Sequence, residues 1–299
     1  METTHFYNRV FIDALKGKTH YNIPDLEEGY RKGTDAYNIP HGFKGDFSSA
    51  LKKENIFRRY ATEMYVKDTD ESIISVLATA EAEICGVGDA YPEDSDEFTQ
   101  IPFEAYKIAS LCKVSENFVY DKKFDIQKYI TNEFARRFGR AEEHYFINGT
   151  GVGQPTGILD AADIGVETAE LTYDDVVKLF FSVKPEYRKN AVWVMNDDTA
   201  LKLRTLKDAN GSYIWNHSDN TILGKPVEIS NHMPNVKSGN KPIFFGDLSY
   251  FWILQRDVLY VRTLVEKYAP QGAVGYVGTE RLDGKLVRSE AVKTLSITA

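Results

Sequence analysis

The chain is poor in cysteine and contains no long apolar run. Cys85 and Cys112 are its two cysteines, too few for a disulfide framework and, on their own, for a metal site. Reduced thiols are expected, in keeping with synthesis in a cytoplasm. No stretch approaches the roughly 18 apolar residues of a membrane span, and the first residues lack the character of a signal peptide. The sequence therefore predicts no membrane association, no metal site and no cofactor.

The usual sequence signatures of catalysis are also missing. None of the six histidines belongs to a metal-binding pair of the H-E-x-x-H type. There is no G-x-S-x-G nucleophile elbow, and neither cysteine has the setting of a catalytic thiol. His144 is expected to lie on a helix surface. We therefore predict no catalytic residue. A soluble α/β enzyme stays as the alternative of another class, and sedimentation would reveal it as a small oligomer.

Charge is distributed unevenly along a chain whose composition is that of a globular protein. Hydrophobic residues make up 42%, charged residues 27%, and the mean hydropathy is -0.38. Residues 1–60 contain ten Lys and Arg against eight Asp and Glu, a net +2, and the remainder contains 26 against 36, a net -10. A protein that mainly grips nucleic acid usually has a concentrated basic patch. This sequence has none, which argues against that class of function.

The longest regular pattern predicts a helix over residues 126–147, spanning roughly 33 Å. Asp125 stands at the N-cap position, and Phe124 can pack onto Tyr129 across it. Asn148-Gly149 is expected to supply a left-handed stop. The apolar stripe advances by three or four residues and consists of Ile126, Ile130, Phe134, Phe138, Ala141 and Tyr145. The opposite face is expected to be a mixed-charge surface of Arg136, Arg137, Arg140, Glu142 and Glu143.

A glycine-rich run, GTGVGQPTG at residues 149–157, follows this helix. A phosphate-binding glycine loop follows a strand and opens a helix, whose N-terminus receives the anion. Here the helix comes first, and no Gly-Lys-Ser/Thr ends the glycine run. The order favours a tight structural turn over a nucleotide site.

Residues 1–60 are predicted to form an arm with short helical pieces, because glycines and prolines interrupt the segment repeatedly. Its aromatic residues are too numerous for a disordered tail. They are Tyr7, Phe11, Tyr21, Tyr30, Tyr37, Phe43, Phe47 and Phe57. Such rings need a surface to bury against, which is either their own subunit or a neighbour.

Residues 72–114 are predicted to form a long two-stranded hairpin, with apolar and β-branched limbs at 72–85 and 98–114. Its tip is strongly acidic and carries Asp89, Glu93, Asp94, Asp96 and Glu97. Paired carboxylates can serve a metal site or acid–base catalysis. Five acids without a histidine or a fixed spacing are more typical of a solvated or partner-facing surface. Because an isolated ribbon is marginal in water, the hairpin is expected to lie on something.

From about residue 165 the pattern becomes compact α/β. Thr172 and Asp175 form a capping box that opens a helix. A short buried strand at 191–195, a helix at 197–207 and strands at 227–230, 242–245 and 291–297 follow. Long apolar strands at 250–264 and 272–281 are expected to return to the helix at 126–147, with Asp283-Gly284 as a hairpin turn.

These segments resemble tailed-bacteriophage major capsid proteins of the Hong Kong 97 fold. The segment ARRFGRAEEHYFING followed by GTGVGQPTGIL resembles the family's spine helix and the loop after it. NIPHGFKGDFSSALKKENIFRRYAT precedes it in the family's order. VMNDDTALKLRTLKDANGSYIW, LGKPVEISNHMP, IFFGDLSYFWILQRDVLYVR and GAVGYVGTERLDGKLVRSEAVKTLSI follow it. The order of these segments, rather than any one of them, carries the resemblance.

The resemblance implies an α+β fold in four parts. They are an N-terminal arm at 1–60, an extended hairpin loop at 72–105, a peripheral domain at 61–71, 106–164 and 248–288 with the spine helix at 126–147, and an axial domain at 165–247 and 289–299. Axial domains of the family meet around pentamer and hexamer centres, and the extended loop lies on the adjacent subunit. The acidic hairpin tip is therefore expected to meet basic residues of a neighbour, the candidates being Arg136, Arg137 and Arg140.

The implied function is that of a major capsid protein that self-assembles into an icosahedral shell around double-stranded DNA. An acidic body suits a wall that faces DNA without sequence-specific contact, although solubility explains the charge equally well. The implied partners are other copies in pentamers and hexamers, a separate scaffolding protein, a portal and a maturation protease. The implied location is the virion, after assembly in the cytoplasm of a host bacterium. An encapsulin-like compartment shell, which would be expected to begin with a cargo-binding helix, is the alternative with the same fold.

Two features depart from what is common in the family. Many members begin with a scaffolding segment of about a hundred residues, whereas the arm motifs begin here almost at once, so a separate scaffold or a processed form is expected. Some members also join their subunits by an isopeptide bond between a lysine and an asparagine, beside a buried glutamate. Glu280 matches the glutamate, but residues 72–106 contain no lysine and no asparagine follows Asn240. We therefore predict no such bond, and a structural partner for Glu280 in Arg281 or the arm.

Overall fold

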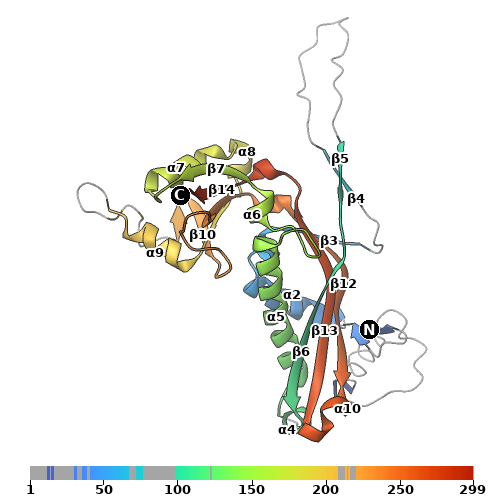
Figure 1. The fold of residues 1–299 in the computed structure, drawn as a ribbon. Helices are drawn as coiled ribbons and strands as arrows, with labels where there is room; N and C mark the ends of the chain where they lie inside the picture. Colours follow the sequence, from blue (N-terminus) through green and yellow to red (C-terminus); the bar gives the residue numbers. More distant parts are fainter. Residues whose placement is uncertain are drawn as a thin grey trace, which may run out of the picture.

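A computed structural model describes residues 12–13, 15–16, 30–31, 36–38, 41–66, 72–76, 98–121, 123–207, 213, 215 and 220–298. The chain forms a long, narrow sheet lined by one helix and a compact α/β unit at one end of it (Figure 1). Within the described part, no helix is both long and apolar enough to cross a membrane.

The long sheet is built on two strands of 14 residues each, β12 and β13, which pair antiparallel along most of their length. β6 pairs antiparallel with the other edge of β13, from Ala273 opposite Ser115 to Leu282 opposite Tyr106. The strands of this sheet are β1 (Tyr30–Arg31), β2 (Ala36–Asn38), β12 (Phe251–Leu264), β13 (Ala273–Leu286), β6 (Tyr106–Ser115) and, parallel to β12, β3 (Thr62–Tyr65).

The spine helix, α5 (Ile126–Asn148), lies along one face of the long sheet (Figure 1). The predicted start is confirmed, because the Asp125 carboxylate accepts a hydrogen bond from Lys128 N at 3.0 Å. The predicted contact of Phe124 with Tyr129 is also present, with ring centroids 5.4 Å apart. Phe134 and Phe138 of the apolar stripe are completely buried against the sheet. Burial of each such side chain stabilises the fold by about 1.5–3 kcal/mol.

Part of the predicted arm belongs to this core. Residues 41–54 form one helix, α2 (His41–Glu54), longer than the short pieces expected, and Phe47 and Leu51 pack on the spine helix. Leu15 is also buried there, and its carbonyl accepts a hydrogen bond from the Tyr276 hydroxyl at 2.7 Å. At these positions, and at Phe57, the chain packs on its own subunit. Contact of the arm with a neighbour stays a prediction.

The compact sheet is mixed and has the order β7-β14-β11-β8-β10-β9. Its strands are β7 (Asp163–Thr168), β14 (Val292–Ile297), β11 (Ile243–Gly246), β8 (Val192–Met195), β10 (Lys225–Ile229) and β9 (Thr221–Ile222). Three helices accompany it: α7 (Tyr173–Ser182), α8 (Pro185–Arg188) and α9 (Asp197–Thr205). The predicted capping box of Thr172 and Asp175 is present at the start of α7. The rings of Trp193 and Phe245 stack in the core of the compact sheet, with their centroids 4.1 Å apart. The compact α/β unit therefore has an apolar core of its own.

A separate two-stranded ribbon, β4 (Ser72–Val76) and β5 (Phe98–Pro102), projects away from both sheets (Figure 1). The prediction that the return limb runs as one strand to residue 114 is wrong. The limb breaks after Pro102, and residues 106–115 leave the ribbon to pair with β13 as β6. The remaining short elements are α3 (Phe57–Tyr60), α4 (Glu116–Val119), α6 (Ile158–Ala161), α10 (Val265–Tyr268), η1 (Leu248–Tyr250), η2 (Ala269–Gln271) and η3 (Ser289–Ala291).

The predicted left-handed stop of the spine helix is wrong. Gly149 is extended, with φ -63° and ψ 144°, and its N–H donates to Tyr145 O at 2.8 Å. A Cβ atom there would lie 2.2 Å from the Pro155 carbonyl oxygen. The glycine is therefore required by the close approach of the turn that follows. That tight turn was predicted correctly, because Thr150 and Thr156 bridge across it.

The predicted hairpin turn at Asp283-Gly284 is also wrong, because β13 runs straight through it. A Cβ on Gly284 would lie 2.6 Å from the Phe146 ring, so glycine is needed where the spine helix touches the strand. The chain reverses instead at α10 and η2, where Gly272 has φ +60°. A glycine next to an aspartate thus reflects packing here rather than a turn.

Candidate functional site

The three arginines proposed to meet a neighbour lie on the spine helix in different settings. Arg136 and Arg137 both bind Glu133, at 2.6 and 2.7 Å. Burial would raise the pKa of Glu133, but the two arginines outweigh it and lower that pKa. Arg137 also donates to the Leu111 carbonyl at 2.6 Å, which ties it to β6. Arg140 is the most exposed of the three and lies 3.7 Å from Glu54.

The five acids proposed as partners of these arginines lie outside the described residues. They are Asp89, Glu93, Asp94, Asp96 and Glu97. Their contact with Arg136, Arg137 or Arg140 of a second copy stays a prediction. Of the three arginines, Arg140 is the least committed within its own subunit, because its one ion pair in the described part is long and solvated.

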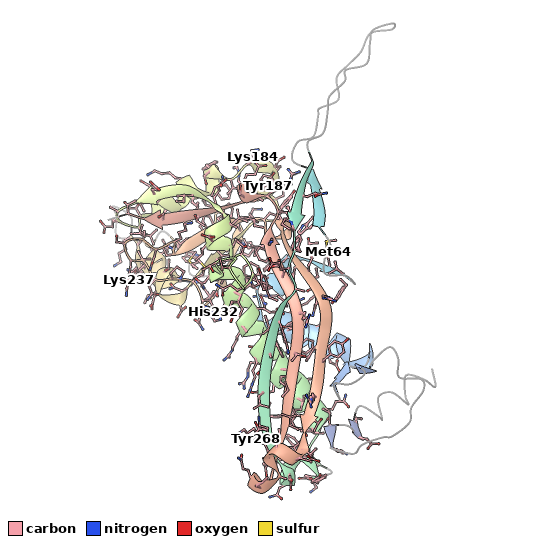
Figure 2. The ribbon with its side chains drawn as sticks, turned by 45° about the vertical axis from the view of Figure 1, so that its right-hand side comes forward. Met64, Lys184, Tyr187, His232, Lys237 and Tyr268 are labelled. Atoms are coloured by element: carbon pink, nitrogen blue, oxygen red, sulfur yellow. The ribbon has the colours of Figure 1, made fainter. Side chains whose placement is uncertain are left out.

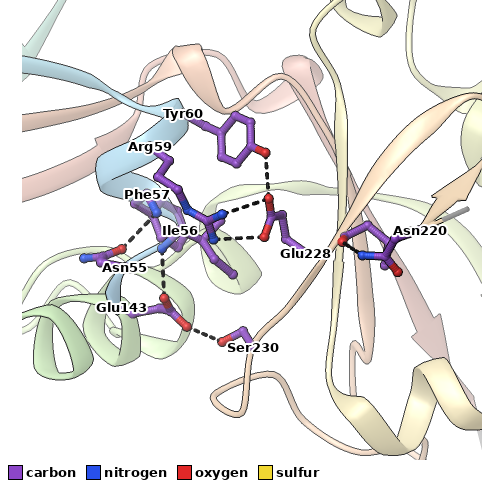
Figure 3. Close-up of polar contacts among 10 residues, drawn as sticks. Asn55, Ile56, Phe57, Arg59, Tyr60, Glu143, Asn220, Glu228 and Ser230 are labelled. Atoms are coloured by element: carbon purple, nitrogen blue, oxygen red, sulfur yellow. Dashed lines mark hydrogen bonds and ion pairs between the residues drawn. The ribbon is translucent and has the colours of Figure 1, made fainter. Parts of the chain in front are cut away.

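The prediction that Glu142 and Glu143 lie on a charged helix surface is wrong. Their exposed fractions are 0% and 6%. Glu143 accepts hydrogen bonds from Ile56 N at 2.9 Å and from the Ser230 hydroxyl at 2.6 Å (Figure 3). Since Ile56 precedes α3 and Ser230 follows β10, this carboxylate joins two other elements to the spine helix.

A second polar contact fastens α3 to the compact sheet. The Arg59 guanidinium makes a two-pronged contact with Glu228 of β10, at 3.1 and 2.9 Å, and the Tyr60 hydroxyl donates to the same carboxylate at 2.6 Å (Figure 3). Partial burial and the bond to Glu228 raise the pKa of Tyr60 to about 12, so the phenol stays a donor at neutral pH. Together with Glu143, these contacts form a junction between the two sheets.

A cluster of buried charged side chains adjoins this junction. Arg58 is 3% exposed and holds Glu142 through two bonds, Nε to Oε2 at 2.9 Å and Nη2 to Oε1 at 2.6 Å. Its Nη1 donates to Gln255 of β12 at 3.2 Å and lies 3.6 Å from Glu63 of β3. Asn55 donates a further bond to Glu142 at 2.9 Å. Burial opposes the charge of Arg58, but Glu142 outweighs it and raises the pKa of the guanidinium.

Glu280 of β13 faces this cluster and is 1% exposed. Neither of its oxygens accepts a hydrogen bond within the described part of the chain. Burial and the nearby Glu142 carboxylate raise the pKa of Glu280 well above its ordinary value, against the opposing effect of Arg58. Two carboxylates are both acceptors, so they can hydrogen-bond only when one carries a proton. Arg58, a residue of the predicted arm, is thus its neighbour of opposite charge.

The base of the projecting ribbon is also held by charged groups. Asp283, which is completely buried, accepts a hydrogen bond from Glu104 N at 2.9 Å. Lys285 donates to the Pro102 carbonyl and lies 5.5 Å from the centre of the Phe103 ring. Burial raises the pKa of Asp283. These contacts fix the direction in which the ribbon leaves the long sheet.

The polar groups described here hold neighbouring elements of the chain together. Glu142 and Glu143 are engaged by donors from neighbouring elements. Among the described residues, no group of three or more His, Cys, Asp or Glu is placed to hold a metal ion. His144, predicted to be exposed, lies on the helix surface with its ring 5.4 Å from that of His232. The arrangement is typical of a subunit with a rigid body and projecting appendages.

Comparison with known proteins identifies the family. Residues 35–297 match the model of the phage capsid family. The chain belongs to this family. Its fold is similar to that of the capsid of a native GTA particle, with a TM-score of 0.67 and 23% identity over 94% of this chain and 96% of that one. It is also similar to the capsid of an empty GTA particle, with a TM-score of 0.70 and 25% identity over 96% of this chain and 98% of that one. It is also similar to a structure from Microbacterium phage Oxtober96 (0.62, 16%, 95% and 98%). No match was found among curated proteins.

The phage capsid chain therefore has the α+β fold of Hong Kong 97-type capsids and is a major capsid protein of a tailed-phage shell. Copies of it self-assemble into a shell of capsomers, which makes it a structural protein of the virion. In this setting the junction and the buried cluster keep the two sheets of one capsid subunit in a fixed relation, while the ribbon extends beyond the subunit's body.

Proposed function

We propose that the capsid chain closes into icosahedral shells of pentamers and hexamers around double-stranded DNA. The projecting ribbon supports this most directly. β4 and β5 pair only with each other in the described part of the chain. An isolated two-stranded ribbon is marginal in water, so it gains stability by lying on a second copy. Such a contact joins unlike surfaces, and closed symmetry keeps it from growing into an open filament.

The division of labour within the subunit follows the two sheets. Residues 165–247 and 289–299 act as the axial domain around capsomer centres, and residues 72–105 act as the extended loop on the adjacent subunit. The arm at 1–60 and the peripheral domain at 61–71, 106–164 and 248–288 complete the subunit. Separate apolar cores in the two sheets support this division. Within shells, Arg140 and its neighbours Arg136 and Arg137 receive the acidic loop tip.

The packaged DNA meets this wall without sequence-specific contact. Residues after 60 carry a net charge of -10, which disfavours the phosphate contacts that hold DNA-binding proteins on DNA. A separate scaffolding protein, a portal and a maturation protease complete the particle, which assembles in the cytoplasm of the host bacterium. The chain itself acts by assembly and has no catalytic role.

Electron microscopy and sedimentation of the purified chain test this proposal. Closed shells of uniform size are expected, either from the chain alone or after co-expression with a scaffolding protein encoded beside it. Monomers and small oligomers in every condition of salt, concentration and co-expression would contradict it. Portal and terminase genes next to this gene would support a phage shell, and a cargo-enzyme gene would instead indicate an encapsulin-like compartment.

A further inference from the structure

Two histidines face each other where the compact α/β unit meets the spine helix. His144 is exposed on the spine helix, and His232 is half-buried in the loop that follows β10 (Figure 2). Their ring centroids are 5.4 Å apart, and the ring planes make an angle of 63°. The two residues are far apart in the sequence, so only the fold brings them together. We call them the histidine pair.

The backbone on both sides of the histidine pair is held in place. The Asn148 side-chain amide, at the end of the spine helix, donates to the His232 carbonyl at 2.9 Å. His232 N donates to the Ser230 hydroxyl at 3.2 Å, and that hydroxyl donates to Glu143 of the spine helix at 2.6 Å. Within the described part of the chain, no hydrogen bond occupies a ring nitrogen of either histidine. The two imidazoles are thus held close together with their nitrogens available.

The separation of the two rings suits a shared metal ion. An imidazole nitrogen binds Zn²⁺ at about 2.0–2.1 Å, and the ligands of this ion are arranged tetrahedrally. Two imidazoles on one such ion therefore have centroids roughly 5 Å apart, close to the separation found here. Imidazole suits Zn²⁺, Cu²⁺ and Ni²⁺, whereas Mg²⁺ and Ca²⁺ prefer oxygen ligands. Of the charged groups that act on His232, Glu143 attracts a cation and Arg140 repels one, so the surrounding charges largely cancel.

We propose that the histidine pair binds a divalent transition-metal ion of the Zn²⁺ type, which bridges the spine helix and the compact unit. His144 and His232 supply two ligands and water supplies the others, because the described part of the chain places no third histidine, cysteine or carboxylate with them. The affinity is therefore lower than that of a structural zinc site with four protein ligands. Because the bound ion holds two elements of the folded chain, it stabilises the subunit.

Calorimetric titration of the unassembled, tag-free chain with zinc chloride tests the site. His144→Asn and His232→Asn should each weaken the binding of one Zn²⁺ by at least about tenfold, since loss of even an outer-shell partner typically costs roughly 10–100-fold. Neither change removes the backbone bonds that hold the loop. His41→Asn, which removes a histidine of α2, is the matched control and should bind as the unmodified chain does. Absence of Zn²⁺ binding by the unmodified chain, or unchanged affinity in either pair variant, would overturn the inference.

Two further measurements distinguish a shared ion from separate ions on each histidine. Separate ions would make each single variant lose one bound ion at unchanged affinity for the other, which would overturn the inference. Zn²⁺ should raise the thermal midpoint of the unmodified chain but not that of the double variant, and Mg²⁺ should raise neither. An equal rise in the double variant would show that the ion acts elsewhere and would also overturn it. Failure of the chain to form shells would contradict only the proposed function, because the site belongs to a single subunit.

Discussion

Replacing Glu280 with glutamine should stabilise the subunit at neutral pH and change its stability little near pH 4. Glu280 is 1% exposed and lies near Glu142, with no hydrogen bond to its oxygens in the described part of the chain. Burial and the nearby Glu142 raise its pKa well above the ordinary value, so folding favours the neutral acid. Glutamine has the same shape and offers an N–H donor where the protonated acid offers its O–H. The substitution therefore keeps the geometry and removes only the titration.

The sign follows from the direction of the shift. A carboxyl whose folded pKa is raised contributes stability that is fully present below its unfolded pKa, about 4.3, and is lost as the pH rises toward the folded pKa. Each pH unit in that window costs about 1.4 kcal/mol, because the unfolded chain releases a proton that the folded chain retains. The loss that glutamine avoids therefore grows with pH as long as the unfolded side chain is ionised and the folded one is not.

Urea unfolding of the unassembled chain between pH 4 and pH 8 measures this difference, with tryptophan fluorescence as the signal. The stability advantage of Glu280→Gln should grow with pH across the window. A difference that is the same at every pH would refute the reasoning. Glu142→Gln is the informative second variant, because it leaves Arg58 free to pair with Glu280. We expect it to lower the overall stability and to flatten the dependence on pH, since the repelling carboxylate is gone.

Three further outcomes are expected. Gly284→Ala should destabilise the subunit by about 1–3 kcal/mol in urea unfolding, because the added Cβ would meet the Phe146 ring at 2.6 Å; an unchanged midpoint would contradict the packing argument. Mature particles boiled in denaturant should run as a single band near 33.9 kDa, and a ladder of covalent oligomers would contradict this. Replacing the five acids of the loop tip with lysine should block or misdirect assembly while the monomer stays folded, and normal shells at unchanged salt sensitivity would contradict that contact. The five are Asp89, Glu93, Asp94, Asp96 and Glu97.

The features best predicted from the sequence are local ones. The caps at Asp125 and Thr172 depend on atoms within three residues, so their spacing alone is informative. The wrong predictions concern contacts between residues that are distant in the sequence. Residues 106–115 have the alternation of a strand, but a period of two does not say which strand lies beside it, and β13 rather than β4 takes that place.

The buried cluster was missed although one signal for it was present. Glu142 stands four residues after Phe138 and four before Phe146, so it lies on the buried stripe of the spine helix and not on its outer face. A carboxylate at such a position requires a buried cation or a proton. The cation comes from Arg58, 84 residues earlier, and a second carboxyl group with a raised pKa, Glu280, lies beside Glu142 from β13. Spacing alone cannot identify such partners.

The value of this cluster lies in orientation more than in stability. A buried ion pair seldom stabilises a fold more than well-packed apolar residues would, whereas loss of one partner costs about 3–5 kcal/mol. Arg58 binds Glu142 of the spine helix, and the next residue, Arg59, binds Glu228 of the compact sheet. One short segment is thus fixed to both halves of the subunit by directional bonds. In the proposed shell, the compact sheet meets other copies around the capsomer centre and the ribbon lies on the adjacent subunit. Both contacts can form repeatedly only if their separation is constant, and these bonds hold it constant.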